Sequence, residues 1–282
     1  MKRGNLNERK MYEAMERLVA FEPEDGYYLA YSGGKDSDAV LNLAILAGVK
    51  FEAVHNLTTV DAPETVRYIQ ANPLVRISKP RLDMFHLIIE KGFPPTRLQR
   101  YCCSELKERE GMGKVTLTGV RWSESENREK NSGLVKIIGK LKGTINMAEW
   151  YRAVYRVSEK GGVILNDDNA PSRRMVEHCY RTRKTMVNPI IDWTDSEVWG
   201  FLDYCKVSSN PLYECGYKRI GCVGCPLAGR RTRKNEFLRY PGYKKMYIKA
   251  FDRMIEEKHK RGEEYRLNWK TGEDVFNWWV SR

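Results

Sequence analysis

The sequence predicts an α/β protein built on a doubly wound, mostly parallel sheet. Short apolar runs typical of strands alternate along the chain with helical segments, which is the pattern of βαβ units. A glycine-rich turn joins the first such run to the next helix, the place where doubly wound folds hold phosphate groups. At 282 residues the chain is long enough for one large domain with an appendage.

The expected elements follow one another in a regular order. A helix is expected over residues 7–19, then strands at 26–31 and 51–56 on either side of a helix at 38–47. Helices at 63–70 and 81–91 and a β-branched strand at 114–120 continue the alternation. Thr194 suits an N-cap because Glu197 follows three residues later, and a long helix is expected over 243–260.

Three segments are expected along the chain. Residues 1–24 form an N-terminal helix, residues 25–228 the sheet domain, and residues 229–282 a basic, helical extension. Residues 129–183 show a weaker pattern with many basic side chains. We interpret them as an insertion outside the sheet that carries specificity.

The charge balance is basic, with 49 Lys and Arg against 37 Asp and Glu, a formal net charge of +12. Such a surface attracts nucleotides or nucleic acid. No apolar run approaches the length of about 18 residues that a membrane span needs, and the first residues are polar rather than signal-like, so a cytoplasmic protein is expected. The seven cysteines include an adjacent pair and a CxxC, which indicates metal or redox chemistry before structural disulfides.

Residues 32–37 read Ser-Gly-Gly-Lys-Asp-Ser and join a strand to a helix. Backbone N–H groups at the helix N-terminus, the Lys35 charge, and the Ser32 and Ser37 hydroxyls suit a phosphate. The GxxxxGK(S/T) spacing of kinases and GTPases is absent from this segment.

This loop resembles the pyrophosphate loop of the N-type ATP pyrophosphatases, in particular those of the phosphoadenylyl-sulfate reductase family. Residues 59–65 resemble that family's Asp…Pro-Glu-Thr segment, and residues 119–128 its Gly-x-Arg-x-x-x-Ser-x-x-Arg stretch. Residues 189–194 and 210–213 also match, so the resemblance covers roughly 26–226. It implies an adenine nucleotide alpha hydrolase-like fold that binds ATP or adenylyl sulfate.

The resemblance also implies a set of site residues. Those expected to bind the nucleotide are Tyr31, Ser32, Gly33, Gly34, Lys35, Asp36, Ser37, His55, Asn56, Thr59, Gly119, Arg121, Ser125 and Arg128. Lys35 and Arg121 are expected to act in catalysis, and Asp36 or Asp61 to assist a Mg²⁺ ion that neutralises the phosphates. For His55, a structural role is the favoured interpretation.

Four cysteines make a CC…CxxC set: Cys102, Cys103, Cys222 and Cys225. In adenylyl-sulfate reductases this arrangement holds a [4Fe–4S] cluster, and the resemblance implies one here. A zinc site is the main alternative. Cys215 is an alternative fourth ligand to Cys103, and a three-cysteine cluster with an open iron remains an option. Cys179 and Cys205 are expected to be buried apolar side chains.

The resemblance leads to three functional hypotheses. The family's reductases attack sulfate sulfur with a cysteine in a C-terminal Glu-Cys-Gly; here Glu214-Cys215-Gly216 precedes the CxxC and residues 276–282 hold no cysteine. We therefore expect first an iron–sulfur-dependent ATP pyrophosphatase or adenylyltransferase in sulfur transfer, as in DNA phosphorothioation or tRNA thiolation. Its partners would be DNA or tRNA, a cysteine desulfurase or another sulfur-relay protein, and further copies in an oligomer. The alternatives are a sulfite-forming adenylyl-sulfate or phosphoadenylyl-sulfate reductase and a non-catalytic nucleotide-binding subunit.

Overall fold

The computed structural model describes residues 4–263 and 269–282. Residues 1–3 of the expected N-terminal segment and 264–268 of the expected extension lie outside these ranges. The chain divides into two compact units. Unit 1 comprises Met1–His55, Tyr68–Arg76 and Gly111–Arg219, and unit 2 comprises Asn56–Arg67, Ile77–Glu110 and Ile220–Arg282.

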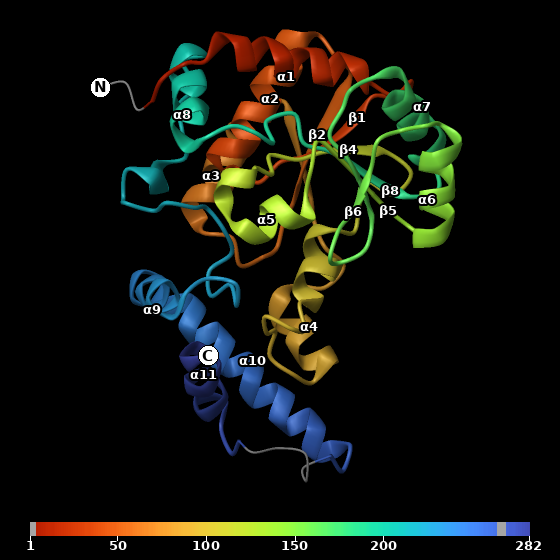
Figure 1. Ribbon diagram of the computed structural model, residues 1–282. Helices are drawn as coiled ribbons and strands as arrows, with labels where there is room; N and C mark the ends of the chain where they lie inside the picture. Colours follow the sequence, from red (N-terminus) through yellow and green to blue (C-terminus); the bar gives the residue numbers. More distant parts are fainter. Residues whose placement is uncertain (1–3, 264–268) are drawn as a thin grey trace. The chain divides into compact units, whose positions relative to one another are not determined.

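Helices and strands alternate through most of the chain (Figure 1). The strands are β1 (Tyr27–Ala30), β2 (Phe51–Asn56), β3 (Val75–Ser78), β4 (Val115–Leu117), β5 (Val135–Ile138), β6 (Arg156–Val157), β7 (Val163–Leu165) and β8 (Lys184–Val187). The α-helices are α1 (Glu8–Ala20), α2 (Lys35–Ala47), α3 (Pro63–Gln70), α4 (Met84–Lys91), α5 (Glu126–Asn131), α6 (Leu141–Trp150), α7 (Ala170–Cys179), α8 (Asp195–Tyr204), α9 (Arg230–Arg239), α10 (Pro241–Lys260) and α11 (Gly272–Ser281). Short helical turns are the π-helix η1 (Cys103–Lys107) and the 3₁₀-helices η2 (Trp122–Glu124) and η3 (Pro211–Tyr213).

The sheet has the strand order β3-β2-β1-β4-β8-β5-β7-β6. The pairs β2–β1, β1–β4 and β4–β8 are parallel, and β8–β5, β5–β7 and β7–β6 continue the sheet in antiparallel pairings. Parallel neighbours require crossover connections, which α2 supplies between β1 and β2. The predicted α/β class is confirmed.

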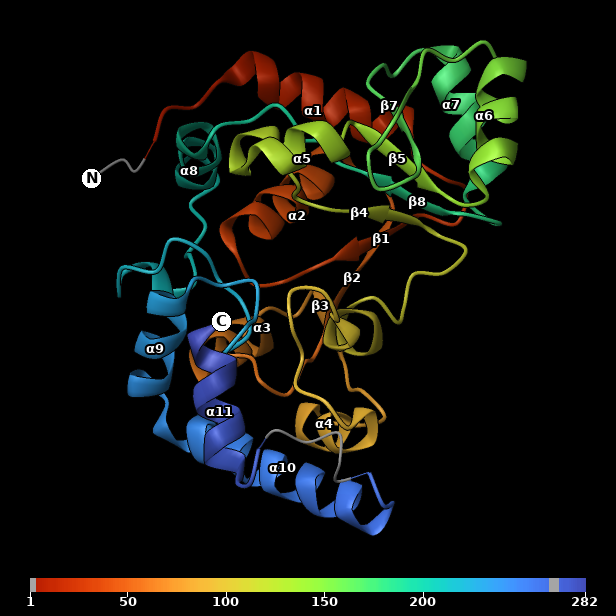
Figure 2. The ribbon, with the colours of Figure 1, turned by 60° about the horizontal axis from the view of Figure 1, so that its bottom comes forward.

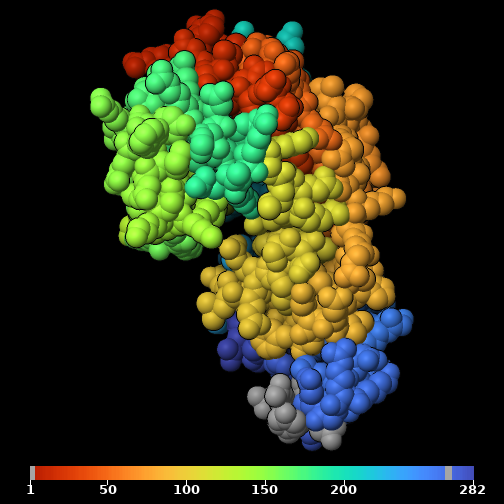
Figure 3. Space-filling model, turned by 90° about the vertical axis from the view of Figure 1, so that its right-hand side faces the viewer, coloured from red at the N-terminus to blue at the C-terminus, as the bar shows by residue number. Residues whose placement is uncertain are grey.

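The expectation that residues 129–183 stay outside the sheet is wrong. This segment supplies β5, β6 and β7, and β5 pairs directly with β8. Val135, Ile137, Val163 and Leu165 are fully buried, so two short β-branched runs form sheet core between the basic residues that obscured them. The rest of the segment, green in Figure 3, covers one corner of unit 1.

Three helices of unit 1 pack side by side: α1 on α2, and α2 on α8 (Figure 2). The Asn7 side chain caps α1 by accepting a hydrogen bond from the Lys10 N–H, so the helix begins within one residue of the expected start at residue 7. Helix α2 begins at Lys35, three residues before the predicted start, because Gly34 serves as its N-cap. Its first turn therefore contains Lys35, Asp36 and Ser37, three of the residues expected to bind phosphate.

The helices of unit 2 pack around α10, which contacts α4, α9 and α11. Its core is aromatic: the rings of Tyr247 and Trp279 lie 4.8 Å apart between centroids, and Phe237 packs edge-on against Tyr247 at 5.7 Å. Aromatic pairs of this kind add packing energy beyond the area they bury. In the described part of the chain, no helix has both the length and the apolar character for a membrane crossing.

Candidate nucleotide and cysteine sites

The loop between β1 and α2 has the backbone conformation that its glycines predict. Gly33 has φ +70°, a region that favours glycine. The Ser37 hydroxyl accepts the N–H groups of Ser32 and Gly34 at 3.3 and 3.2 Å and donates to the Gly34 carbonyl at 2.8 Å. The side chain of Ser37 thus holds the turn in shape from inside, whereas Ser32 is exposed.

Lys35 and Arg121 are buried beside two carboxylates. Lys35 is 4% exposed, with its Nζ 3.2 Å from Asp36 and 3.4 Å from Asp195. Arg121 is 2% exposed, with Nε 2.8 Å from Asp36 and Nη2 2.5 Å from Asp195. Although burial opposes ionisation of Asp195, the hydrogen bond from Arg121 and the charges of Lys35 and Arg121 keep its pKa below the usual value. Two cations and two carboxylates thus meet at the N-terminus of α2.

Asp195 is absent from the predicted site residues. It opens α8 directly after the N-cap Thr194, so its sequence context indicates a helix start rather than a site. The signal that could have identified it was the family-like segment 189–194 immediately before it.

Gly119 lies at the point where the chain after β4 meets the loop. A Cβ atom at Gly119 would lie 2.8 Å from the backbone of Asp36, closer than real Cβ contacts allow. The absent side chain therefore lets residues 119–121 approach the loop. Two other residues expected to bind the nucleotide interact with neighbours in the sequence. Ser125 caps α5, and Arg128 forms an ion pair with Glu124 at 3.2 Å.

A segment far along the chain contacts the loop. The Asn210 side-chain amide donates to the Gly33 carbonyl at 3.0 Å, and the Tyr213 hydroxyl accepts the Lys35 N–H at 2.9 Å. Tyr213 thus holds a backbone amide that the resemblance assigns to phosphate.

Behind the loop, Tyr31 and Tyr68 donate hydrogen bonds to Asp38 at 2.5 and 3.1 Å. Burial raises the pKa of Asp38 to about 6, against the lowering effect of those two hydrogen bonds. His55 is 5% exposed, and its Nδ1 lies 3.0 Å from the Tyr31 carbonyl, which agrees with the structural role favoured for it.

Three of the predicted residues belong to unit 2 and are engaged there. Asn56 donates to the Lys107 carbonyl at 2.9 Å, and the Thr59 hydroxyl accepts the Met84 N–H at 2.9 Å. Asp61 accepts the Thr58 N–H at 2.7 Å and forms a backbone bridge with Cys222. The structure therefore places Asp61 at the CxxC loop, and its expected assistance to Mg²⁺ remains a prediction.

Both cysteine pairs belong to unit 2. Cys102 precedes the π-helix η1, which begins at Cys103, and such helices are frequent at functional sites. Cys222 and Cys225 lie on a turn closed by the Cys225 N–H donating to the Cys222 carbonyl at 3.2 Å. Two hydrogen bonds hold this turn in place. The Val223 N–H donates to the Val60 carbonyl at 2.8 Å, and the Tyr247 hydroxyl donates to the Val223 carbonyl at 3.1 Å.

The thiols influence one another electrostatically. A hydrogen bond between Cys102 and Cys103 raises the pKa of Cys102 and lowers that of Cys103 to about 6, and Cys222 and Cys225 raise the pKa of Cys102 further. Burial raises the pKa of Cys222 to about 11. The thiolates of Cys222, Cys225 and Cys103 and the carboxylate of Asp61 raise the pKa of Lys107.

The sequence did not indicate Lys107 as a site residue. It lies in residues 105–110, a run of mixed charges that is typical of a solvated helix face. Its ammonium instead supplies positive charge to the cysteine set. Such a charge favours the thiolate form that metals require.

The donor set fits an iron–sulfur cluster in chemistry, although its thiols are not positioned as a finished metal site. Within residues 4–263 and 269–282, no three Cys, His, Asp or Glu side chains meet in a metal-binding arrangement. Four thiols are nevertheless the ligands that a cubane takes, and Lys107 adds positive charge beside them. Cys215 is exposed and belongs to unit 1, Cys179 is buried as expected, and Cys205 is half-buried.

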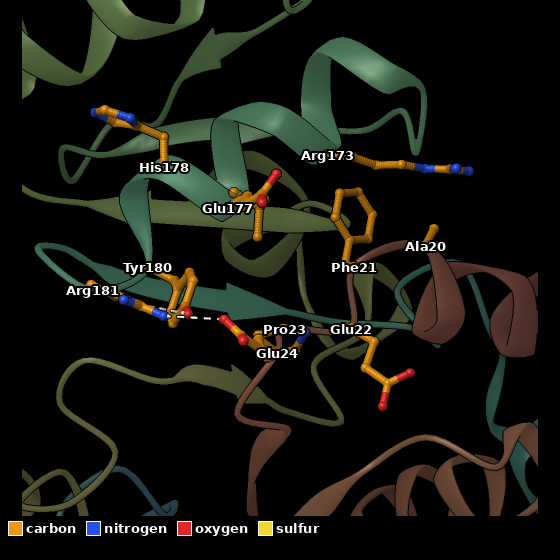
Figure 4. A pocket seen from close by; sticks show the side chains of 11 residues that line it. Ala20, Phe21, Glu22, Pro23, Glu24, Arg173, Glu177, His178, Tyr180 and Arg181 are labelled. Carbon is orange, nitrogen blue, oxygen red and sulfur yellow. Dashed lines mark hydrogen bonds and ion pairs between the residues drawn. The ribbon is translucent and has the colours of Figure 1, made fainter.

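A pocket of about 590 Å³ lies elsewhere in unit 1 (Figure 4). Arg173, Glu177 and His178 of α7 line it together with residues 20–24, and Arg181 reaches Glu24 at 3.6 Å. Residues 20–24 precede β1, whereas residues 32–37 follow its carboxyl end. This pocket is therefore separate from the loop of residues 32–37.

Comparison with known proteins identifies a family. The model of the phosphoadenosine phosphosulfate reductase domain matches residues 26–228. An uncharacterised protein of Methanocaldococcus jannaschii is 26% identical over 241 residues, covering 80% of this chain and 46% of that protein. The adenosine 5′-phosphosulfate reductase of Allochromatium vinosum is 45% identical over 42 residues, 15% of this chain and 16% of that enzyme. This chain thus spans less than half the length of these two curated relatives.

Among solved structures, the phosphoadenylyl-sulfate reductase of Candida auris in complex with phosphate gives a TM-score of 0.44 at 18% identity. The match covers 74% of this chain and 88% of that one.

Proposed function

The chain belongs to the phosphoadenosine phosphosulfate reductase domain family, and on that premise we propose that it is an iron–sulfur-dependent ATP pyrophosphatase that adenylates an acceptor in sulfur transfer. One observation carries the proposal: Lys35 and Arg121 are both buried against Asp36 and Asp195 at the N-terminus of α2. This arrangement suits a polyphosphate and its divalent cation better than a sulfate alone.

In the proposed complex, the β- and γ-phosphates of ATP bind the amides of residues 32–37, and the Asp36 carboxylate would hold a Mg²⁺ ion that neutralises phosphate charge. An acceptor oxygen attacks the α-phosphorus, the bond from that phosphorus to the α–β bridging oxygen breaks, and pyrophosphate leaves. Lys35 and the loop amides stabilise the charge that develops on the leaving group. Arg121 orients Asp36 through their 2.8 Å contact.

Cys102, Cys103, Cys222 and Cys225 would hold the proposed [4Fe–4S] cluster, with Lys107 offsetting its negative charge. When bound, the cluster would supply a sulfur-binding or structural centre for the sulfur-transfer step. Asp61 and Thr58 position Cys222, through the backbone bridge and a 3.5 Å contact between Sγ and the Thr58 hydroxyl.

The proposed acceptor is nucleic acid. Arg230, Arg231 and Lys234 are exposed at the start of α9, a few residues after Cys225 in the sequence. Exposed basic side chains of this kind bind phosphate backbones with an affinity that falls as salt rises.

Anaerobically purified protein tests the proposal. With ATP and Mg²⁺, pyrophosphate release should require an acceptor, with duplex DNA, tRNA and a cysteine desulfurase added separately. Iron and sulfide should both fall in Cys102→Ser, Cys222→Ser and Cys225→Ser but stay unchanged in the matched control Cys179→Ser. Comparison of Cys103→Ser with Cys215→Ser identifies the fourth ligand. Stoichiometric zinc without sulfide would reject the cluster, and tight ATP binding without turnover under any condition would favour a binding subunit.

A reductase is the second candidate, favoured by the local match to adenosine 5′-phosphosulfate reductase and by the exposure of Cys215. Sulfite formation from adenylyl sulfate or phosphoadenylyl sulfate with thioredoxin as reductant would support it. Loss of that activity in Cys215→Ser, with iron retained, would identify the nucleophile.

A further inference from the structure

Arg233 is a buried cation in unit 2 that lacks most of the partners a guanidinium needs. It is 1% exposed on α9. Its Nη1 donates to the Trp279 carbonyl at 2.7 Å, and its guanidinium lies 5.8 Å from the centroid of the Trp279 ring. Its Nε and Nη2 are buried and make no hydrogen bond to any described residue. Because these two N–H groups are shielded from solvent, only an acceptor inside the protein could satisfy them.

Few acidic groups act on Arg233. Burial lowers its pKa and the cations Arg97 and Arg230 lower it further, whereas Cys225 and Glu236 act in the opposite direction. Glu236 already has another partner, because its Oε2 accepts a hydrogen bond from the Gly224 N–H at 2.8 Å. Cys225 is the other group that raises the pKa of Arg233.

Close packing fixes α9 against the CxxC turn. Gly224 has φ +76°, and a Cβ there would lie 2.6 Å from the Phe237 ring and 3.0 Å from the Trp279 ring. Arg97 joins the same region by donating from Nε to the Pro226 carbonyl at 3.1 Å. Side chains of α9 and α11 therefore pack directly against the turn that carries Cys225.

We propose that Arg233 is a positioning residue for the cluster, whose unpartnered N–H groups donate to sulfur at Cys225. The inference rests on the proposed iron–sulfur function. A cluster bound by four thiolates is anionic, and hydrogen bonds to its sulfur atoms adjust its stability and potential. The guanidinium thereby gains the acceptors that it lacks in the protein alone, and the cluster gains a counter-charge on the side of Cys225.

The test compares Arg233→Met, which removes the donors at similar length, with Arg233→Lys, which keeps the charge. The control is Arg231→Met, exposed on the same helix. Iron and sulfide are measured first, then the anaerobic rate of iron loss to a chelator, then the Fe–S bands of resonance Raman spectra in H₂O and in D₂O. A role confined to folding would not alter the deuterium sensitivity of these bands.

We expect Arg233→Met to lose iron about tenfold faster than wild type and to lack the deuterium shift of the Fe–S bands. Arg233→Lys should be intermediate, and Arg231→Met should match wild type. If Arg233→Met does not fold, the test uses Arg233→Lys instead. A deuterium shift of the Fe–S bands in Arg233→Lys equal to that of the wild type would contradict the proposal. Wild-type iron loss and an unchanged shift in Arg233→Met would overturn this inference alone. Wild-type protein without iron and sulfide would overturn the proposed cluster and this inference with it.

Discussion

Lys35 and Arg121 contact the same oxygen atom, Oδ1 of Asp195, at 3.4 and 2.5 Å. Both also contact Asp36, so the two cations and two carboxylates form one charge network around the first turn of α2. Any anion that binds this turn meets cations whose positions are already set. Preorganised charge of this kind stabilises a leaving group without reorganisation during the reaction.

Lys35→Met should therefore impair the proposed chemistry more than the fold. We expect pyrophosphate release to fall by about 10²- to 10³-fold, the range for loss of one electrostatic contact to a developing charge. The rate is measured at saturating ATP, with the exposed Lys142→Met of α6 as the matched control. Equal rates in the two variants would contradict a role for Lys35 at the leaving group.

Gly119→Ala should weaken nucleotide binding through the backbone. Its Cβ would be forced 2.8 Å from Asp36, so the loop would have to shift. We expect the Kd for ATP, measured by calorimetry, to rise about tenfold, equivalent to about 1.4 kcal/mol. Gly143→Ala on α6, where the nearest atom would be 3.7 Å away, serves as control and should leave the Kd unchanged. An unaltered Kd in Gly119→Ala would show that the loop tolerates displacement.

Tyr213→Phe should stabilise the nucleotide complex relative to the free protein. The variant loses the acceptor of the Lys35 N–H, so without ligand its free energy of unfolding should fall by about 1 kcal/mol. Bound phosphate would take that amide instead, so by linkage the affinity for ATP should rise by about fivefold. Urea denaturation and ATP titration measure the two effects, with the exposed Tyr204→Phe as control. A weaker affinity would mean that the Tyr213 hydroxyl itself contacts the nucleotide.

Glu197 should make the stability of unit 1 depend on pH. Burial opposes its ionisation, but hydrogen bonds from the Thr194 N–H, Lys10 and Asn7 lower its pKa from 4.5 to about 2. A carboxyl whose folded pKa is depressed adds stability above its unfolded pKa and loses it as the pH falls through the folded value.

At pH 7, Glu197→Gln should lower the free energy of unfolding by about 1 kcal/mol. The difference from wild type should shrink below pH 4.5 and vanish near pH 2. Denaturant unfolding at a series of pH values measures it. A difference that stays constant with pH would assign the effect to the shape of the side chain rather than to its charge.

Much of unit 1 was predictable because its signals are local. The strand, the glycine turn and the helix around residues 27–47 follow from hydrophobic pattern and glycine placement, and Thr194 with Glu197 forms the expected capping box. The glycine turn was predicted at residues 32–37, where the structure has it, and the binding of phosphate there remains a prediction. The resemblance then placed Arg121 at the loop, although no local pattern joins it to Asp36.

What sequence reasoning missed depends on long-range pairing. Asp195 and Lys107 were not among the predicted site residues, because neither has a local pattern that reveals its partners. Strands β5 and β7 were missed because each contains only three apolar residues. Their burial comes from pairing with β8 and with each other, which no window of sequence contains.

The interleaving of the two units has a consequence for synthesis of the chain. Cys102 and Cys103 lie in the second stretch of unit 2, whereas Cys222 and Cys225 lie in the third, and Gly111–Arg219 of unit 1 separates them. During translation the first cysteine pair is made before β4 and β8, and its partner pair only after both. Insertion of the proposed cluster would therefore wait until every strand of the sheet has been synthesised, and an arrest of translation between β8 and Cys222 would yield a chain with all of its strands but only two of the four proposed ligands.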